Sequence, residues 1–278
     1  MSSLFMRFPG NKAKALTLSY DDGVEQDKRL ISILDKHGIK CTFNINSGLF
    51  SPEGTVFEKG QIHRRMTEKE AVELYKDSGH EVAVHGLTHP FLEQLPTNMA
   101  TYEIIQDRKN LEQLFGTIIR GMAYPFGTFS DEVVAVLRAS GIVYSRTVMD
   151  TEDFSLPTDW LRLPATCHHK HPELNSLTER FVTQTPRFAP WLFYLWGHSY
   201  EFEADDNWNI IEEFSKKIGG RNDIWYATNI EIYNYMEAYQ NLLFSVDASM
   251  VHNPTSHTLF FEYNNQSYQI NPGESLRL

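Results

Sequence analysis

Two adjacent aspartates, Asp21 and Asp22, follow a stretch of alternating apolar residues and precede Gly23. The alternation over residues 16–20 indicates a strand that ends at this pair. Because adjacent side chains on an extended chain point in different directions, the two carboxylates can perform different tasks from one place. One can hold a metal ion while the other accepts a proton. Aspartate and glycine also dominate plain turns, so the pair needs support from other parts of the chain.

Histidines stand at the end of another predicted strand. His85 directly follows the strand pattern at residues 81–84, His89 comes four residues later, and Pro90 follows it. One helical turn there would bring the two imidazoles onto the same face, about one metal ion apart. Two neutral imidazoles and one carboxylate leave positions of a zinc-like ion open for water and substrate. Asp22, His85 and His89 are therefore the candidate metal ligands.

A third histidine, His198, ends the apolar strand pattern 193–198 directly after Gly197. An unperturbed imidazole titrates near neutral pH, so this side chain could donate a proton to a leaving group. The pattern alone also fits a histidine that is hydrogen-bonded in the core or on its rim.

The segments that must position these residues alternate between strand and helix patterns. Strand patterns cover residues 16–20, 39–46, 80–85, 121–124, 142–148, 193–198 and 223–228. Helix patterns cover residues 25–37, 67–78, 98–115, 130–140, 207–218 and 229–240, with a capping box at 67–70 and an N-cap at Ser130. The alternation of seven strand patterns with six helix patterns predicts parallel strands in a barrel or doubly wound sheet. In a barrel the carboxyl ends of the strands converge, and all candidate residues lie at such ends.

The length of 278 residues fits one α/β barrel with a small appendage. We expect the barrel over residues 1–240 and a small β extension packed on it over residues 241–278, with a hairpin turn at residues 264–266. Residues 149–192 are long, polar and proline-bearing, so we expect a structured loop on the active-site face.

The composition and charge argue against several classes of binding partner. The formal net charge of −11 argues against binding to a nucleic acid backbone. No apolar run reaches the length of a signal peptide or a membrane span, so a cytoplasmic protein without membrane contact is expected. The two cysteines, Cys41 and Cys167, cannot form a disulfide framework. Nothing in the sequence indicates the oligomeric state.

Together, the strand-end motifs resemble the polysaccharide deacetylase family, the NodB-homology domains of carbohydrate esterase family 4, over roughly residues 12–240. Residues 19–23, Ser-Tyr-Asp-Asp-Gly, are similar to the family's first motif, usually Thr-Phe-Asp-Asp-Gly. Residues 85–89 match its histidine motif, except that Gly86 replaces Ser or Thr. Residues 124–127 look like the third motif and residues 195–198 like the last. The resemblance implies an α/β fold, a distorted (β/α)7 barrel.

The resemblance also implies a function: a metal-dependent hydrolase that removes acetyl groups from an N- or O-acetylated carbohydrate. Asp22, His85 and His89 would bind a divalent ion, with Zn²⁺ expected and Co²⁺, Ni²⁺ or Mn²⁺ as alternatives. Asp21 would take the proton of the attacking water, and His198 would protonate the leaving group.

Further roles follow from the same resemblance. The backbone N–H of Phe126 would hold the oxyanion together with the metal, and Tyr124 and Trp196 are expected at the substrate. The family's Asp-x-x-Asp-Trp motif has two imperfect counterparts: residues 150–154 keep the spacing but lose the tryptophan, and Asp159-Trp160 keeps the dipeptide but comes later. Of these, Asp153 is the one expected to orient His198. Histidines in residues 167–171 are expected to line the substrate groove or face solvent, with a metal site as the alternative.

One position departs from the family. Ala123 stands where an arginine usually braces the catalytic aspartate; Arg120 and Arg146 are near it in sequence. This departure motivates an alternative function, a carbohydrate-binding protein that has lost turnover. Another alternative is hydrolysis of a non-sugar C–N bond on the same fold. An open, aromatic-lined cleft would favour a glycan, and a closed small pocket would favour a metabolite.

Overall fold

A parallel barrel forms the centre of the protein, whose computed structural model describes residues 3–278. Its strands pair in the order β6-β5-β4-β3-β2-β9. The strands are β2 (Lys14–Asp21), β3 (Thr42–Ile45), β4 (Glu81–Val84), β5 (Gly121–Ala123), β6 (Tyr144–Asp150) and β9 (Trp191–Gly197). The segment 163–168 completes the ring, because β7 (Leu163–Ala165) pairs with β6 and β8 (Cys167–His168) pairs with β9. Only Thr166 separates these two short strands, so they act as one strand of a seven-stranded barrel.

The predicted fold class is confirmed, with one exchange among the strands. β10 (Ile224–Tyr226), expected as a barrel strand, pairs only with the beginning of β2 and lies outside the ring. The segment 149–192, expected as a loop, supplies β7, β8 and α5 (Leu174–Thr183). Its strands are very short and contain Pro164, which removes a ladder donor, so no strand pattern marks them in the sequence.

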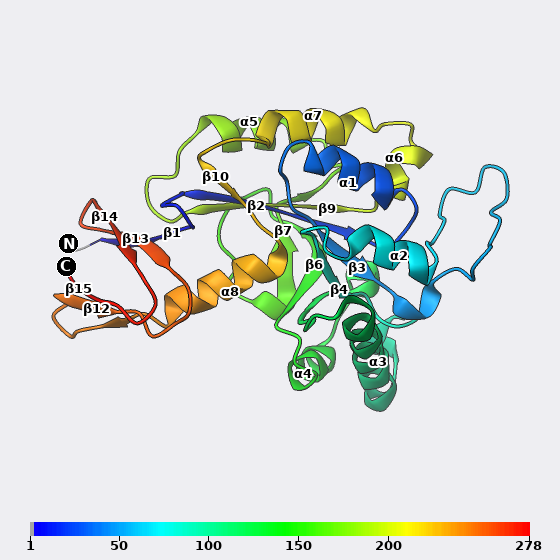
Figure 1. The fold of residues 1–278 in the computed structure, drawn as a ribbon, viewed down its shortest axis with the longest axis horizontal. Coiled ribbons are helices and arrows are strands. Elements are labelled where there is room, and N and C mark those ends of the chain that lie inside the picture. Colours follow the sequence, from blue (N-terminus) through cyan, green and yellow to red (C-terminus); the bar gives the residue numbers. More distant parts are fainter. Residues whose placement is uncertain (1–2) are drawn as a thin grey trace.

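Helices cover the outside of the barrel. They are α1 (Asp27–Asp35), α2 (Glu68–Tyr75), α3 (Thr97–Phe115), α4 (Asp131–Ala139), α5, α6 (Tyr200–Ala204), α7 (Asn209–Ile218) and α8 (Asn229–Gln240). Figure 1 shows α1, α5 and α7 together over one side of the sheet, and α8, α3 and α4 on the opposite side. The predicted capping box at Thr67 and the N-cap at Ser130 are both formed.

Side-chain alternation along β2 separates the core from the site. Leu16, Leu18 and Tyr20 belong to the main apolar core, which also contains side chains of the surrounding helices. Ser19 and Asp21 occupy the opposite face, toward the barrel interior, because successive strand side chains point to opposite sides. The strand therefore buries its apolar residues outward and delivers polar ones inward to its carboxyl end.

The C-terminal strands form a β extension at one end of the molecule (left in Figure 1). One sheet combines β1 (Leu4–Arg7) with β13 (Leu259–Tyr263) and β14 (Gln266–Ile270). The other combines β11 (Leu243–Phe244), β12 (Met250–His252) and β15 (Ser275–Arg277). Asn264 and Asn265, at φ of 52° and 64°, make the expected tight hairpin turn. β1, from the other end of the chain, is thus part of the extension and not of the barrel.

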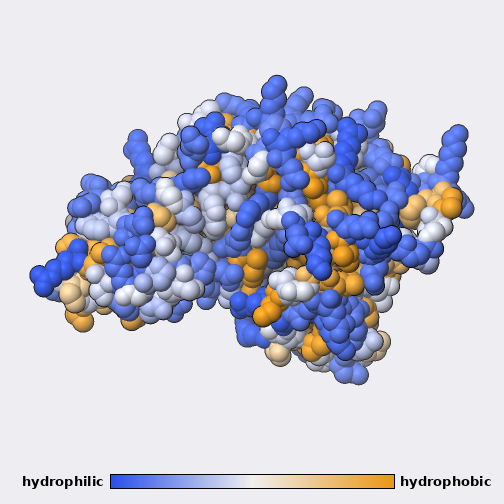
Figure 2. Space-filling model, viewed as in Figure 1, coloured by the Kyte–Doolittle hydropathy of each residue, from blue (hydrophilic) through white to orange (hydrophobic). Residues whose placement is uncertain are grey.

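The face of the molecule shown in Figure 2 is largely hydrophilic, with apolar side chains in patches. Among residues 3–278, no helix combines the length and the apolar character needed to span a bilayer.

Candidate active site

Asp21 and Asp22 separate at the end of β2. Asp21 is the last strand residue and lies opposite Asn44 of β3. Asp22 has a φ of 84°, in the left-handed region that non-glycine residues rarely adopt. Two further residues of the candidate site, His89 and Phe126, have φ of 57°. Backbone strain of this kind concentrates at functional sites, where the surrounding structure maintains it.

Asp21 is almost completely buried and is held from two sides. Asn44 Nδ2 donates to Oδ1 at 2.8 Å, and the Arg146 guanidinium donates to Oδ2. Burial alone would disfavour the charged carboxyl, but Arg146 and the nearby His85 and His198 hold its pKa below the usual range. Asp21 is therefore a fixed carboxylate.

Arg146 is the cation that replaces the missing arginine at position 123. It lies on β6 directly opposite Ala123 in the β5–β6 register, and its side chain is fully buried. Its Nε lies 3.3 Å from Ser19 Oγ, and its guanidinium carbon is 4.4 Å from the centre of the Trp196 ring. These contacts fix the guanidinium, because a planar cation between an aromatic face and a carboxylate has little freedom.

His85 is set up to present one nitrogen to a cation. Its Nδ1 lies 2.8 Å from the carbonyl oxygen of Ala123, which can only accept, so Nδ1 carries the proton and Nε2 has the lone pair. The backbone N–H of His85 donates to Asp107 at 3.1 Å, which fixes the residue at the end of β4. Burial lowers the pKa of the His85 ring and keeps it neutral.

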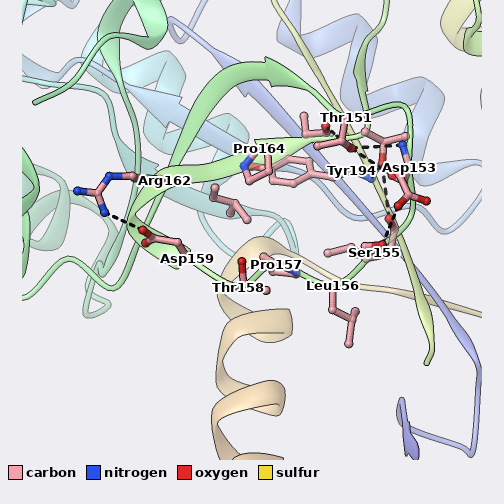
Figure 3. A pocket seen from close by; sticks show the side chains of 14 residues that line it. Thr151, Asp153, Ser155, Leu156, Pro157, Thr158, Asp159, Arg162, Pro164 and Tyr194 are labelled. Atoms are coloured by element: carbon pink, nitrogen blue, oxygen red, sulfur yellow. Dashed lines mark hydrogen bonds and ion pairs between the residues drawn. The ribbon is translucent and has the colours of Figure 1, made fainter. Parts of the chain in front are cut away.

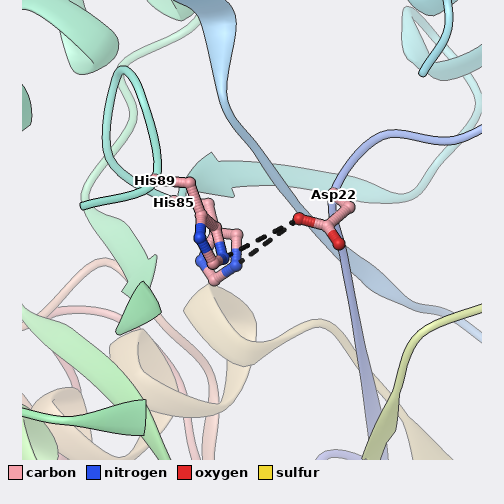
Figure 4. A group of neighbouring side chains, drawn as sticks. All are labelled: Asp22, His85 and His89. Atoms are coloured by element: carbon pink, nitrogen blue, oxygen red, sulfur yellow. Dashed lines mark ion pairs between the residues drawn. The ribbon is translucent and has the colours of Figure 1, made fainter. Parts of the chain in front are cut away.

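His89 completes a compact group with His85 and Asp22, which we call the metal-ligand triad. The Nε2 atoms of His85 and His89 lie 4.0 Å and 3.9 Å from Asp22 Oδ1. Figure 4 shows both imidazoles facing the Asp22 carboxylate. Burial, and then the neighbouring His85, lower the pKa of His89 to about 4, so this ring is neutral too.

The triad fits a zinc-like ion. His85 Nε2 is buried and has no hydrogen-bond partner within residues 3–278, which is costly unless a cation occupies the position. Two ligand atoms that each lie about 2.1 Å from zinc are at most about 4.2 Å apart, and the distances to Asp22 Oδ1 meet this limit. The other nitrogen of His85 has a carbonyl partner, as is usual for metal-ligating histidines.

Two residues of the loop that follows η1 (Ser47–Leu49) also contact Asp22, and sequence reasoning missed both. His63 Nε2 lies 3.1 Å from Oδ2, and Arg65 Nη2 donates to Oδ1 at 3.0 Å. Arg65 also donates to the carbonyl oxygen of Asp22 at 2.6 Å, which supports its unusual backbone conformation. Burial opposes the charge of Asp22, but His63, His85 and Arg65 hold its pKa well below the usual range.

His198 faces the aspartate pair from the end of β9. Its Nε2 lies 3.7 Å from Asp21 Oδ2, and its Nδ1 lies 3.6 Å from Oε2 of Glu201 on α6. Burial would lower the pKa of the ring, but Glu201, Asp21 and Asp22 outweigh it and raise the pKa above its ordinary value. A histidine in this state stays protonated to higher pH than a free imidazole.

Both the sequence and the fold are similar to those of known proteins. Residues 9–145 match the family model described as polysaccharide deacetylase. This region belongs to the polysaccharide deacetylase family. The family match covers the Asp21-Asp22 pair and both histidines of the triad, but ends before His198.

Two curated relatives match about half of the chain. A chitooligosaccharide deacetylase of Sinorhizobium fredii is 24% identical over 151 residues, which are 53% of this chain and 63% of that protein. The uncharacterized protein YlxY of Bacillus subtilis is 26% identical over 153 residues, or 54% of this chain and 43% of that protein. Both relatives are therefore longer than the region they share with this chain.

The fold is shared more widely than the sequence. The crystal structure of a putative polysaccharide deacetylase from Mycobacterium smegmatis is 17% identical, covers 84% of this chain and 93% of its own, and has a TM-score of 0.58. At this identity the likeness concerns the fold, a distorted (β/α)7 barrel.

The expectation that Asp153 orients His198 is wrong. The Asp153 carboxylate accepts hydrogen bonds from the Phe154 backbone N–H at 2.7 Å and from the Ser155 hydroxyl at 2.7 Å. It lines a cavity of about 240 Å³ together with Pro164 and Tyr194 (Figure 3). That cavity includes no member of the metal-ligand triad, nor Asp21 or His198. Glu201, and not Asp153, faces His198.

The three expected substrate-binding residues differ in exposure. Tyr124 is buried, and its hydroxyl donates to the carbonyl oxygen of Leu161 at 2.7 Å, so it packs and does not face a substrate. Trp196 is also mostly buried, with Nε1 donating to Asp150 at 3.1 Å. Phe126 is 49% exposed and stacks on Phe91, with ring centres 3.9 Å apart. Of the three, only Phe126 presents an open side chain, 4.5 Å from the His89 ring.

Within segment 167–171, His168 and His169 both face the Glu201 carboxylate, and His171 lies 3.5 Å from Glu152. His169 is buried, stacks on Phe202 at 4.1 Å between ring centres, and lies 3.2 Å from Glu201. His168 lies 3.1 Å from the same carboxylate. These contacts connect β8 to α6, directly behind His198.

Proposed function

We propose that this protein is a metal-dependent hydrolase that removes acetyl groups from an N- or O-acetylated carbohydrate. The observation that carries the proposal is a convergence at the carboxyl ends of β2, β4 and β9. His85 Nε2 and His198 Nε2 lie 3.9 Å and 3.7 Å from the same oxygen, Asp21 Oδ2. A base, a ligand set and an acid thus surround one small space, as acyl transfer from a poor leaving group requires.

The metal-ligand triad would hold the ion, for which Zn²⁺ is the expected metal. Bound there, such an ion supplies Lewis-acid polarisation of a carbonyl and lowers the pKa of water. Arg65 and His63 orient Asp22 by contacts to both carboxylate oxygens. Arg65 also adds a fixed positive charge beside the site.

Asp21 would act as the general base. Its carboxylate stays charged because Arg146 lowers its pKa, and Asn44 fixes the orientation of Oδ1. Oδ2 faces both His85 and His198, so it borders the space where the acetyl group must lie. A rigid, ionised carboxylate at this place can remove the proton of an attacking water.

His198 would act as the general acid. Its raised pKa favours the imidazolium form, and Nε2 faces Asp21 across the site. An amide nitrogen is a poor leaving group until it is protonated, so hydrolysis of an N-acetyl group depends on this proton. Asp21 would thus accept the proton of the attacking water, and His198 would supply the proton of the leaving group.

The aromatic pair Phe91 and Phe126 supports a carbohydrate as the substrate. The rings stack beside His89, and both are more than one-third exposed. An exposed aromatic surface next to the reactive centre can pack against the apolar face of a sugar ring. The backbone N–H of Phe126 is the candidate donor to the oxyanion.

The alternative of a binding protein without turnover depended on Ala123. Because Arg146 occupies the position opposite Ala123 and pairs with Asp21, the departure at residue 123 no longer argues for a lost activity. Hydrolysis of a non-sugar C–N bond has no feature in its favour beyond the shared fold.

The experiment is acetate release by the purified protein loaded with Zn²⁺ or Co²⁺. The substrates are N-acetylated chitooligosaccharides, an O-acetylated xylan and a small cyclic amide. We expect acetate from one of the glycans, loss on chelation and recovery on adding metal back. Opening of the cyclic amide without acetate release from either glycan would favour the non-sugar alternative.

A further inference from the structure

A cluster of histidines surrounds one carboxylate on the Nδ1 side of His198. Oε2 of Glu201 lies 3.1 Å from His168 Nε2, 3.2 Å from His169 Nε2 and 3.6 Å from His198 Nδ1. We call Glu201 and these three histidines the Glu201 cluster. It joins β8, the end of β9 and α6.

The hydrogen bonds of His168 identify the cluster as a hydrogen-bonded one and not as a metal site. The backbone N–H of Lys170 donates to His168 Nδ1 at 3.1 Å, so Nδ1 is the acceptor. The proton of the neutral ring is then on Nε2, which faces Glu201 and donates to it. A nitrogen that carries a proton cannot bind a metal. Lys170 Nζ, 3.4 Å from the other carboxylate oxygen, adds a fixed cation.

Glu201 is an ionised acceptor in this setting. Burial opposes its charge, but the close imidazoles of His168, His169 and His198 hold its pKa far below the usual range. One oxygen is thus available to the imidazoles, while the other faces Lys170.

The backbone keeps His198 and Glu201 together. They are three residues apart on one turn, and the Glu201 N–H donates to the His198 carbonyl at 3.1 Å. The intervening Ser199 hydroxyl donates to the buried Asp27 at 2.5 Å, which fixes the turn to α1. His198 Nδ1 is buried and has no hydrogen-bond partner within residues 3–278. The nearest carboxylate oxygen, Glu201 Oε2, lies 3.6 Å from it, slightly beyond hydrogen-bonding distance.

We propose that Glu201 is the positioning residue of His198: it accepts the Nδ1 proton, directs Nε2 toward the reacting group, and stabilises the imidazolium. The present separation is slightly long, as is common for catalytic contacts that tighten only with substrate bound. His168 and Lys170 in turn fix the carboxylate. Glu201 would thus have the role expected for Asp153, the orientation of His198.

The proposal rests on the proposed hydrolysis, and its proton balance is simple. As the C–N bond breaks, the proton on His198 Nε2 moves to the departing nitrogen, and the Nδ1 proton stays with the ring facing Glu201. Asp21 has taken one proton from water, so one proton enters and one leaves the two residues in each cycle.

The test compares two substrates with the full-length, Zn²⁺-loaded protein. An N-acetylated chitooligosaccharide needs protonation of its leaving nitrogen, whereas 4-nitrophenyl acetate releases a stable anion without an acid. For Glu201→Gln we expect roughly a 10–100-fold lower kcat on the oligosaccharide and a change of less than about threefold on the ester. A merely structural defect would lower both rates alike and would overturn the proposal.

Glu203→Gln is the matched control. It makes the same substitution on the same helix, but Glu203 pairs with Arg64 at 2.9 Å and not with a histidine. We expect wild-type rates on both substrates. The double variant His198→Gln/Glu201→Gln should be no slower on the oligosaccharide than His198→Gln alone, because Glu201 acts through His198. An additional loss would contradict that dependence.

A spectroscopic readout separates this proposal from the proposed function. In metal-free protein at a pH where the His198 ring is neutral, ¹⁵N NMR should find its proton on Nδ1 in the wild type and on Nε2 in Glu201→Ala. An unchanged tautomer would overturn the proposal whether or not any substrate is turned over. Failure of the wild type on both substrates, with the expected tautomers, would instead count against the proposed hydrolysis alone.

Discussion

Arg146 pairs with Asp21 from the strand next to the one on which the family places its bracing arginine. It lies opposite Ala123 in the β5–β6 register, so the guanidinium reaches the same carboxylate from one strand further around the barrel. The small side chain at position 123 leaves the inner face of the barrel free for it. The ion pair is buried on both sides, with Arg146 and Asp21 both less than 5% exposed.

We predict that Arg146→Ala strongly impairs both activity and folding. Removing one partner of a buried ion pair costs about 3–5 kcal/mol, because the other charge remains uncompensated. Acetate release and chemical denaturation measure the two effects. The double variant Arg146→Ala/Ala123→Arg places an arginine on the neighbouring strand and should restore part of the activity and part of the stability. Arg120→Ala is the control, since Arg120 contacts Tyr233 instead. Full activity of a folded Arg146→Ala protein would show that Asp21 needs no bracing cation.

Much of this site could be predicted from the sequence, because its signals are local. Asp22 and His85 directly follow strands whose patterns are clear, and His89 comes four residues after His85. Arg146 could not be assigned, because its partner is 125 residues away and the pairing depends on the register between β5 and β6. No tight turn joins β5 to β6, because α4 lies between them, so their register depends on how the apolar faces pack in the whole barrel.

Other parts were missed for different reasons. Glu201 did leave a local signal, since it follows His198 by three residues on a helical turn, but the family motif directed attention to Asp153. β7 and β8 are too short for a periodic pattern to mark them. His63 and Arg65 lie on a loop without a strand end, and only the folded structure brings them to Asp22.

We predict that Gly197→Ala destabilises the protein. A methyl group at this position would overlap Nδ1 of His169, which is buried against β9 and cannot move freely. Overpacking of this kind costs about 1–3 kcal/mol, measured as the free energy of unfolding in denaturant. The control, Gly38→Ala, meets no neighbouring atom, but Gly38 has a φ of 63°, so it should cost only backbone strain of about 1 kcal/mol. Equal stability of Gly197→Ala and wild type would contradict the packing described for His169.

Asp27 should give stability a pH dependence of unusual sign. Burial raises its pKa to about 7, although hydrogen bonds from Ser199 and Tyr75 oppose the shift. The folded protein therefore keeps a proton that the unfolded chain loses above the ordinary value of 3.8. The stabilisation is complete below that value and is lost as pH rises to about 7. For this group the loss is at most about 4 kcal/mol, because one pKa unit corresponds to about 1.4 kcal/mol.

Asp27→Asn isolates this contribution, because an amide can still bond both hydroxyls without titrating. Urea denaturation at several pH values from 4 to 8 should give a flatter profile for the variant than for the wild type. Parallel profiles would show that Asp27 is already ionised in the folded protein at low pH.

The division of labour between the two aspartates is the central claim, and one paired measurement tests it most directly. Zn²⁺ binding by calorimetry and acetate release are compared for Asp21→Asn and Asp22→Asn, with the wild type alongside. We predict that Asp21→Asn binds Zn²⁺ but releases no acetate, because it lacks the base, and that Asp22→Asn loses Zn²⁺ binding and activity together. Loss of Zn²⁺ from Asp21→Asn, with binding retained by Asp22→Asn, would show that the two roles are reversed.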